Sequence, residues 1–145
     1  MLVSDVMVAA LARFRTFDEH RSVRDAAIAF SDTQVGLLVV CGSKGEASGV
    51  VSKSDLVRHL ARSRSVDAPL VEVMSQSVVS TSPGADLRQT WQVMAQRRLQ
   101  NLPLLDADRK PIGMLDIRDA LEAILRNEER QEDDLINYIA GNGYR

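Results

Sequence analysis

The 145-residue sequence has a single cysteine, Cys41, and two histidines, His20 and His59, which lie far apart in the chain. One cysteine excludes an internal disulfide, and no cysteines stand near the histidines at metal-ligand spacing. The sequence also lacks a Gly-x-x-x-x-Gly-Lys-Ser/Thr phosphate loop and an evident pairing of a nucleophile with a base. These absences argue against a redox protein, a metalloprotein and an enzyme.

Excess positive charge and long apolar runs are also missing. Lys and Arg number 18 against 20 Asp and Glu, so the formal net charge of −2 does not favour a general nucleic-acid binder. Basic residues do gather within 13–24 and 53–64, which a solvated surface explains better than phosphate binding. The apolar run at the N-terminus is too short to span a bilayer and no basic segment precedes it. We therefore expect a cytoplasmic protein without a membrane segment.

The chain contains two copies of one unit. Segment 49–57 (GVVSKSDLV) realigns with 113–121 (GMLDIRDAL) at an offset of 64 residues. The same offset relates 35–42 (VGLLVVCG) to 99–106 (LQNLPLLD). Upstream, VSDVM at 3–7 matches LVEVM at 70–74 with an offset of 67. The repeats predict two structural units, residues 1–66 and 67–126, followed by a helical tail at 127–145.

Each unit is predicted to be βαββα: a short strand (about 13–16 or 78–80), a helix, two strands joined by a tight turn (42–45 or 106–110), and a second helix. Ser22 and Asp86 stand where helix N-caps belong. A unit of this size buries little surface alone, so we expect an α+β fold in which the two sheets pack face to face over one core.

With its motifs in register, the chain resembles a tandem pair of cystathionine β-synthase (CBS) domains, often called a Bateman module. The resemblance covers roughly residues 2–126 and rests on the two openers, the two buried strands and the two Gly-h-h-x-x-x-Asp segments, where h is apolar. It implies two repeats related by a pseudo-two-fold axis with helices outside. It also implies a regulatory sensor that binds AMP, ADP, ATP, S-adenosylmethionine or NAD between the sheets and signals to a partner protein.

The first motif has two readings. Gly49 permits close approach of a ligand, Ser52 offers a hydroxyl at a helix start beside Lys53, and Asp55 could accept two hydrogen bonds from a ribose. Alternatively, Ser52 and Asp55 form a capping box, each satisfying backbone donors of the other. The family resemblance favours Asp55 as the ribose ligand and Ser52 as the phosphate contact.

The second motif keeps Gly113 and Asp119 but has Asp116 where the family usually has a hydroxyl. Asp116 suits a helix N-cap, and it would repel a phosphate, although Arg118 or a bound magnesium ion could offset this. We therefore predict unequal sites with the stronger one at Asp55, and no required cofactor. The resemblance also implies adenine slots formed by Phe14, Arg15, Thr16, Gly36, Leu37 and Leu38 in one half and by Val78, Val79, Ser80, Asn101, Leu102 and Pro103 in the other.

Association between chains is also predicted. Two helical stripes, Leu56, Val57 and Leu60 with Leu121, Ile124 and Leu125, favour a homodimer unless all six are buried within one chain. Leu135, Ile136 and Ile139 in the tail need a surface to cover, on their own domain or on a second chain. A dimerisation or scaffold module without ligand is the alternative to the sensor.

Overall fold

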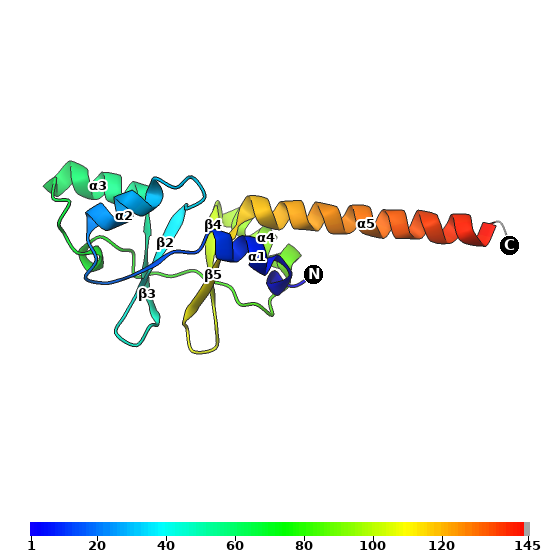
Figure 1. The fold of residues 1–145 in the computed structure, drawn as a ribbon, viewed down its shortest axis with the longest axis horizontal. Coiled ribbons are helices and arrows are strands. Elements are labelled where there is room, and N and C mark those ends of the chain that lie inside the picture. The colour runs from blue at the N-terminus through cyan, green and yellow to red at the C-terminus, as the bar shows by residue number, and fades with distance from the viewer. Residues whose placement is uncertain (144–145) are drawn as a thin grey trace.

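The computed structural model describes residues 1–143 and contains two small sheets that lie side by side (Figure 1). The first sheet has the order β1-β2-β3, with β1 parallel to β2 and β3 antiparallel to it. The second is an antiparallel hairpin of β4 and β5. The strands are β1 (Thr16–Asp18), β2 (Leu37–Cys41), β3 (Ala47–Ser52), β4 (Asn101–Leu105) and β5 (Pro111–Asp116). Both predicted hairpins are confirmed.

The four helices that flank the hairpins follow the predicted pattern, whereas three further helical segments in or just after the openers, at 3–6, 7–12 and 70–72, were not predicted. The helices are η1 (Val3–Val6), α1 (Met7–Ala12), α2 (Val23–Phe30), α3 (Lys53–Ser63), η2 (Leu70–Glu72), α4 (Leu87–Arg97) and α5 (Ile117–Gly143). The Ser22 hydroxyl accepts the N–H of Asp25 at 3.2 Å, and the Asp86 carboxylate accepts the N–H of Gln89 at 2.9 Å. The α+β class is therefore confirmed.

The first strand of each unit differs from the prediction. In the first repeat it begins later, at Thr16, and in the second repeat it is reduced to one bridge between Thr81 and Leu104. In the first repeat the N–H of Val39 donates to the carbonyl of Arg15 at 3.2 Å. The residue 64 positions after Val39 is Pro103, which has no N–H, so the corresponding ladder bond of the second sheet cannot form.

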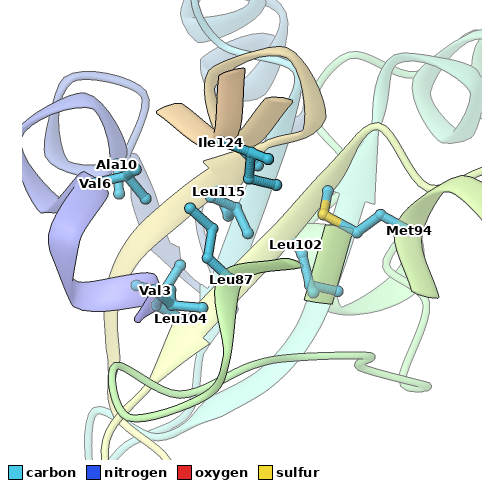
Figure 2. Packing of buried hydrophobic residues seen from close by; sticks show 10 residues of the cluster. Val3, Val6, Ala10, Leu87, Met94, Leu102, Leu104, Leu115 and Ile124 are labelled. Carbon is cyan, nitrogen blue, oxygen red and sulfur yellow. The ribbon is translucent and has the colours of Figure 1, made fainter. Parts of the chain in front are cut away.

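Each opening segment closes the core of the other repeat. Val3, Val6 and Ala10 pack among side chains of the second repeat, including Leu87 and Met94 (Figure 2). Leu70 packs in turn into the core of the first repeat, where it lies in one cluster with Val23 and Leu38. This exchange ties the two repeats together.

A third cluster of buried residues joins the two hairpins. Val39 and Ala47 from the first sheet contact Leu105 and Met114 from the second. The two sheets therefore share a core in addition to the two cores that the helices cover.

The last helix, α5, runs far beyond the rest of the molecule (Figure 1). Its 27 residues correspond to about 40 Å of helix. The helix includes the Gly-Asn-Gly segment at 141–143, which the sequence predicts to be the helix stop. Side chains 128–141 are exposed, and apart from the ion pair between Glu128 and Arg88 this part of the tail is not buried against its own domain.

The six residues of the predicted dimer stripes divide into two groups. Leu56 and Ile124 are buried, and Leu60 packs against the core of the first repeat. Val57, Leu121 and Leu125 are 68%, 37% and 50% exposed. The alternative that all six are buried within one chain is therefore wrong.

Candidate ligand-binding cleft

A cleft of about 550 Å³ lies where the first motif faces the second repeat. Its walls come from the start of β2, the β3–α3 junction, the segment after η2 and the corner between α4 and β4. The lining residues are Gly36, Leu37, Val50, Ser52, Lys53, Ser54, Ser77, Val79 and Arg98 to Leu102. The volume falls within the range of ordinary small-molecule sites.

The two kinds of lining surface suit a ligand with a polar end and an apolar body. Ser52, Lys53 and Ser54 begin α3, where the first N–H groups of the helix have no intrahelical acceptor. Arg98, from the end of α4, adds a second cation. Leucine and valine side chains supply the apolar part of the wall, namely Leu37, Val50, Val79, Leu99 and Leu102. A phosphate near the helix start and a flat base against the aliphatic wall would fit this arrangement.

The capping box at the first motif is confirmed. The Ser52 hydroxyl accepts the N–H of Asp55 at 3.2 Å, and the Asp55 carboxylate accepts the N–H of Ser52 at 2.9 Å. Arg58 also donates to Asp55 at 3.2 Å. Asp55 lies beside the lining residues and is not one of them, and its side chain is 18% exposed. Its ribose-binding role stays a prediction.

The motif glycines lie against the chain itself. A Cβ at Gly49 would lie 2.5 Å from the sulfur of Met74 and 2.8 Å from the carbonyl oxygen of Ser75. A Cβ at Gly113 would lie 3.2 Å from the Cβ of Ala10. In both repeats the glycine therefore makes room for a segment that comes from the opener of the other repeat.

The predicted adenine slots are only partly brought together. Gly36, Leu37, Val79, Asn101 and Leu102 line the cleft alongside Ser52 and Lys53. The other predicted slot residues lie elsewhere: Leu38 and Pro103 are buried, Phe14 packs against the cluster between the sheets, Thr16 is exposed on β1, and Ser80 lines a separate surface hollow with Asp106 and Arg109. The observed cleft combines the first motif with residues of the second repeat, whereas the prediction placed one slot in each half of the chain.

Several lining residues were missed from the sequence. They are Val50, Ser54, Ser77, Arg98, Leu99 and Gln100. Val50 and Ser54 lie within the motif that the sequence had singled out. Arg98 follows a helix in the left-handed conformation, at φ 56°, and the change from helix to strand at this point was the available signal.

The second motif forms a network of charges. Arg118 donates to both oxygens of Asp116 at 3.0 Å, and the backbone N–H of Arg118 donates to Asp116 at 2.8 Å. Asn101 donates to the same carboxylate at 3.4 Å. Burial raises the pKa of Asp116, but the hydrogen bonds from Arg118 and the charges of Arg13 and Arg118 outweigh it, so its pKa lies below the usual value.

Arg13 completes this network from the first repeat. Its Nε and Nη2 donate to the two oxygens of Asp119 at 2.6 and 3.2 Å, and its Nη1 lies 3.5 Å from Asp116. The hydrogen bond to Asp119 is the main reason why the pKa of Arg13 is raised. The Asp119 carboxylate, which the family resemblance assigns to the second ligand site, therefore accepts two hydrogen bonds from a guanidinium of the same chain.

Among residues 1–143, no helix is both long and apolar enough to cross a bilayer. The same residues contain no group of three or more His, Cys, Asp or Glu side chains placed to hold a metal ion.

Two α+β repeats that exchange their opening segments and enclose a cleft between them define a module of two paired domains. The family model of the CBS domain matches residues 3–62 and 70–126, and the chain belongs to this family. It is 28% identical over 127 residues to the CBS domain-containing protein YhcV of Bacillus subtilis, and the aligned region covers 87% of each chain.

Two solved structures show the same fold. CBSX2 in complex with AMP matches with a TM-score of 0.73 and 23% identity, over 88% of this chain and 98% of the other. The CBS domain pair of protein MJ0100, in complex with 5′-methylthioadenosine and S-adenosyl-L-methionine, matches with a TM-score of 0.72 and 17% identity, also over 88% and 98%.

Other curated relatives are longer than the region that they share with this chain. The match covers 63% of a protein from Acidianus ambivalens and 32% of the arabinose 5-phosphate isomerase GutQ of Escherichia coli. The activities of those whole proteins do not transfer to the shared region.

Proposed function

We propose that this protein is a regulatory module, without catalytic activity of its own, that binds an adenosine-containing ligand in the cleft between its repeats. The observation that carries the proposal is the cleft itself, which is lined by Lys53 at the start of α3, by a second cation, Arg98, after the end of α4, and by aliphatic side chains. The family, together with the adenosine-containing ligands bound by CBSX2 and by the CBS domain pair of MJ0100, supports the same ligand class. In this proposal the protein acts in the cytoplasm, and a partner protein responds to whether the ligand is bound in the cleft.

The phosphate of the ligand lies at the start of α3, near Ser52, Lys53 and Arg98, and the base lies against the aliphatic wall. Free N–H groups and the positive end of the helix dipole favour an anion there, and the cations add to this attraction. Phosphate-bearing ligands should therefore bind more tightly than adenosine. AMP needs no metal in this arrangement, and a magnesium ion would be relevant only for ligands with longer phosphate chains.

Thermal unfolding with AMP, ATP, S-adenosylmethionine and NAD tests the proposal. A ligand that binds only the folded state stabilises that state by mass action and so raises the melting temperature. At a concentration of 100 times its Kd it adds about 2.7 kcal/mol to the free energy of unfolding. Lys53→Ala should reduce the shift caused by AMP, whereas Lys44→Ala, an exposed lysine in the first hairpin turn, should leave it unchanged. No shift with any of the four ligands at millimolar concentration would contradict the proposal.

We also propose that the two motifs bind ligand unequally, with the stronger site at the first. The sequence alone suggested that Asp116 would repel a phosphate. The ion pairs with Arg118 and Arg13 compensate that charge, so repulsion is no longer the main argument. What now supports the inequality is the open cleft at the first motif and the filled position at the second.

The protein is proposed to act as a homodimer. Val57, Leu121 and Leu125 remain exposed on the helices that follow the two motifs, and the tail adds exposed Leu135 and Ile139. Light scattering at micromolar concentration should give twice the chain mass, and a monomer mass would rule this out. A scaffold that binds no ligand would give the same dimer without the thermal shift.

A further inference from the structure

We propose that Arg13 permanently occupies the second ligand cleft of the module, so that each chain binds one nucleotide and not two. This inference rests on the proposed function. It concerns a different position from the open cleft, since it assigns a blocking role to Arg13, the residue that follows α1 and pairs with Asp119.

The guanidinium of Arg13 is held by all three of its nitrogens. Nε and Nη2 form the two-pronged pair with Asp119, while Nη1 donates to the carbonyl of Gln34 at 3.2 Å and lies 3.5 Å from Asp116. The side chains of Arg13 and Asp119 are 18% and 17% exposed. A planar guanidinium that meets a carboxylate in this way is among the stronger and more specific side-chain pairs.

The internal repeat identifies what Arg13 replaces. In the first sheet Phe17 pairs with Val40, and in the second Thr81 pairs with Leu104, so both members of the pair differ by 64 residues. At that offset Arg13 corresponds to Ser77, which lines the open cleft. Asp119 corresponds likewise to Asp55. A short serine therefore leaves space beside the first motif, and a long arginine takes up the same place beside the second.

Arg13 also has little freedom to leave. It follows α1, whose Ala10 is buried in the core of the second repeat together with Val6 of η1. A ribose that reached Asp119 would have to displace a cation from an acceptor that already receives two hydrogen bonds. Displacement would also remove one of the positive charges near buried Asp116. The second cleft is thus closed by the chain itself.

A purely structural role for Arg13, in which it only ties α1 to α5, makes a different prediction. Removing a structural tie lowers stability and leaves the number of bound ligands unchanged. Removing an occupant admits a second ligand. The number of nucleotides bound per chain therefore separates the two roles.

Calorimetric titration with AMP is the test, with Arg13→Ser as the main variant because it copies the residue of the open cleft. The wild-type chain should bind one AMP and Arg13→Ser should bind two. Arg21→Ser is the matched control, since Arg21 pairs with Asp25 on the exposed start of α2 and should leave the number at one. Ser77→Arg provides the reverse change at an exposed position, and it should abolish binding in the first cleft.

The outcomes distinguish this inference from the proposed function. Two AMP molecules on the wild-type chain, or one on a folded Arg13→Ser, would overturn the role of Arg13 and leave the proposed function standing. Binding to Arg13→Ser alone would support Arg13 as an occupant and contradict the use of the first cleft. Failure of both chains to bind would overturn both. If Arg13→Ser does not fold, unchanged binding by Ser77→Arg would overturn the inference.

Discussion

Replacing Gly49 by alanine should destabilise the protein, whereas the equivalent change at Gly113 should be nearly neutral. A Cβ at Gly49 would lie 2.5 Å from the sulfur of Met74 and 2.8 Å from the Ser75 carbonyl oxygen. Met74 could move, but the Ser75 backbone is fixed by two hydrogen bonds with Val50, of 3.0 and 2.9 Å. Such overpacking costs about 1–3 kcal/mol, from which the lower entropy of the unfolded alanine chain subtracts about 0.4–1 kcal/mol.

At Gly113 the nearest atom to a new Cβ is the Cβ of Ala10, at 3.2 Å, and the next are 3.6 and 3.7 Å away. The neighbouring side chains need move only slightly, so we expect a change below about 1 kcal/mol. Urea unfolding of both variants measures the difference, and each kcal/mol should lower the melting temperature by about 4 °C. If Gly49→Ala keeps wild-type stability and loses only nucleotide binding, then Gly49 serves the ligand and our packing argument is wrong.

Two further predictions concern the carboxylates of the motifs. Because the pKa of Asp116 is lowered in the folded state, its contribution to stability is present above its unfolded pKa of about 3.9 and is lost as the pH falls through the lower folded value. Asp116→Asn should therefore weaken the acid dependence of urea unfolding below about pH 4, and an unchanged acid limb would contradict the network around it. Asp55→Ala should cost about 1 kcal/mol through loss of the capping box and should also remove most AMP binding. If calorimetry shows that Asp119→Ala weakens AMP binding and Asp55→Ala does not, the ligand site lies in the second repeat and our assignment to the first is wrong.

The sequence predicted the repeat, the hairpins and the helix caps because each depends on local patterns. Ser22 and Asp86 cap their helices through neighbours three residues away, and the buried strands are continuous apolar runs. The absence of a first strand near residue 79 in the second repeat could also have been predicted from the sequence. Pro103 stands where the pairing strand needs an N–H, and the comparison of the two repeats at an offset of 64 exposes this substitution.

The candidate site was less predictable because it depends on contacts between distant segments. Nothing local to Arg13 indicates that it reaches Asp119, 106 residues away. The role of Gly49 was also hidden, since Met74 packs over it only after the openers exchange between repeats. Spacing within one repeat identified the polar start of α3, but the opposite wall from Arg98 to Leu102 belongs to the other repeat.

The central claim is that an adenosine ligand binds between the repeats at the first motif. Amide chemical shifts recorded during titration with AMP test its location directly. We predict saturable changes at Gly36, Leu37, the start of α3 from Ser52 to Ser54, Ser77 and the corner from Arg98 to Leu102. The amides of Arg13 and Asp119 should remain unperturbed. Saturable changes centred on Arg13 and Asp119, or no saturable changes at millimolar AMP, would contradict the account.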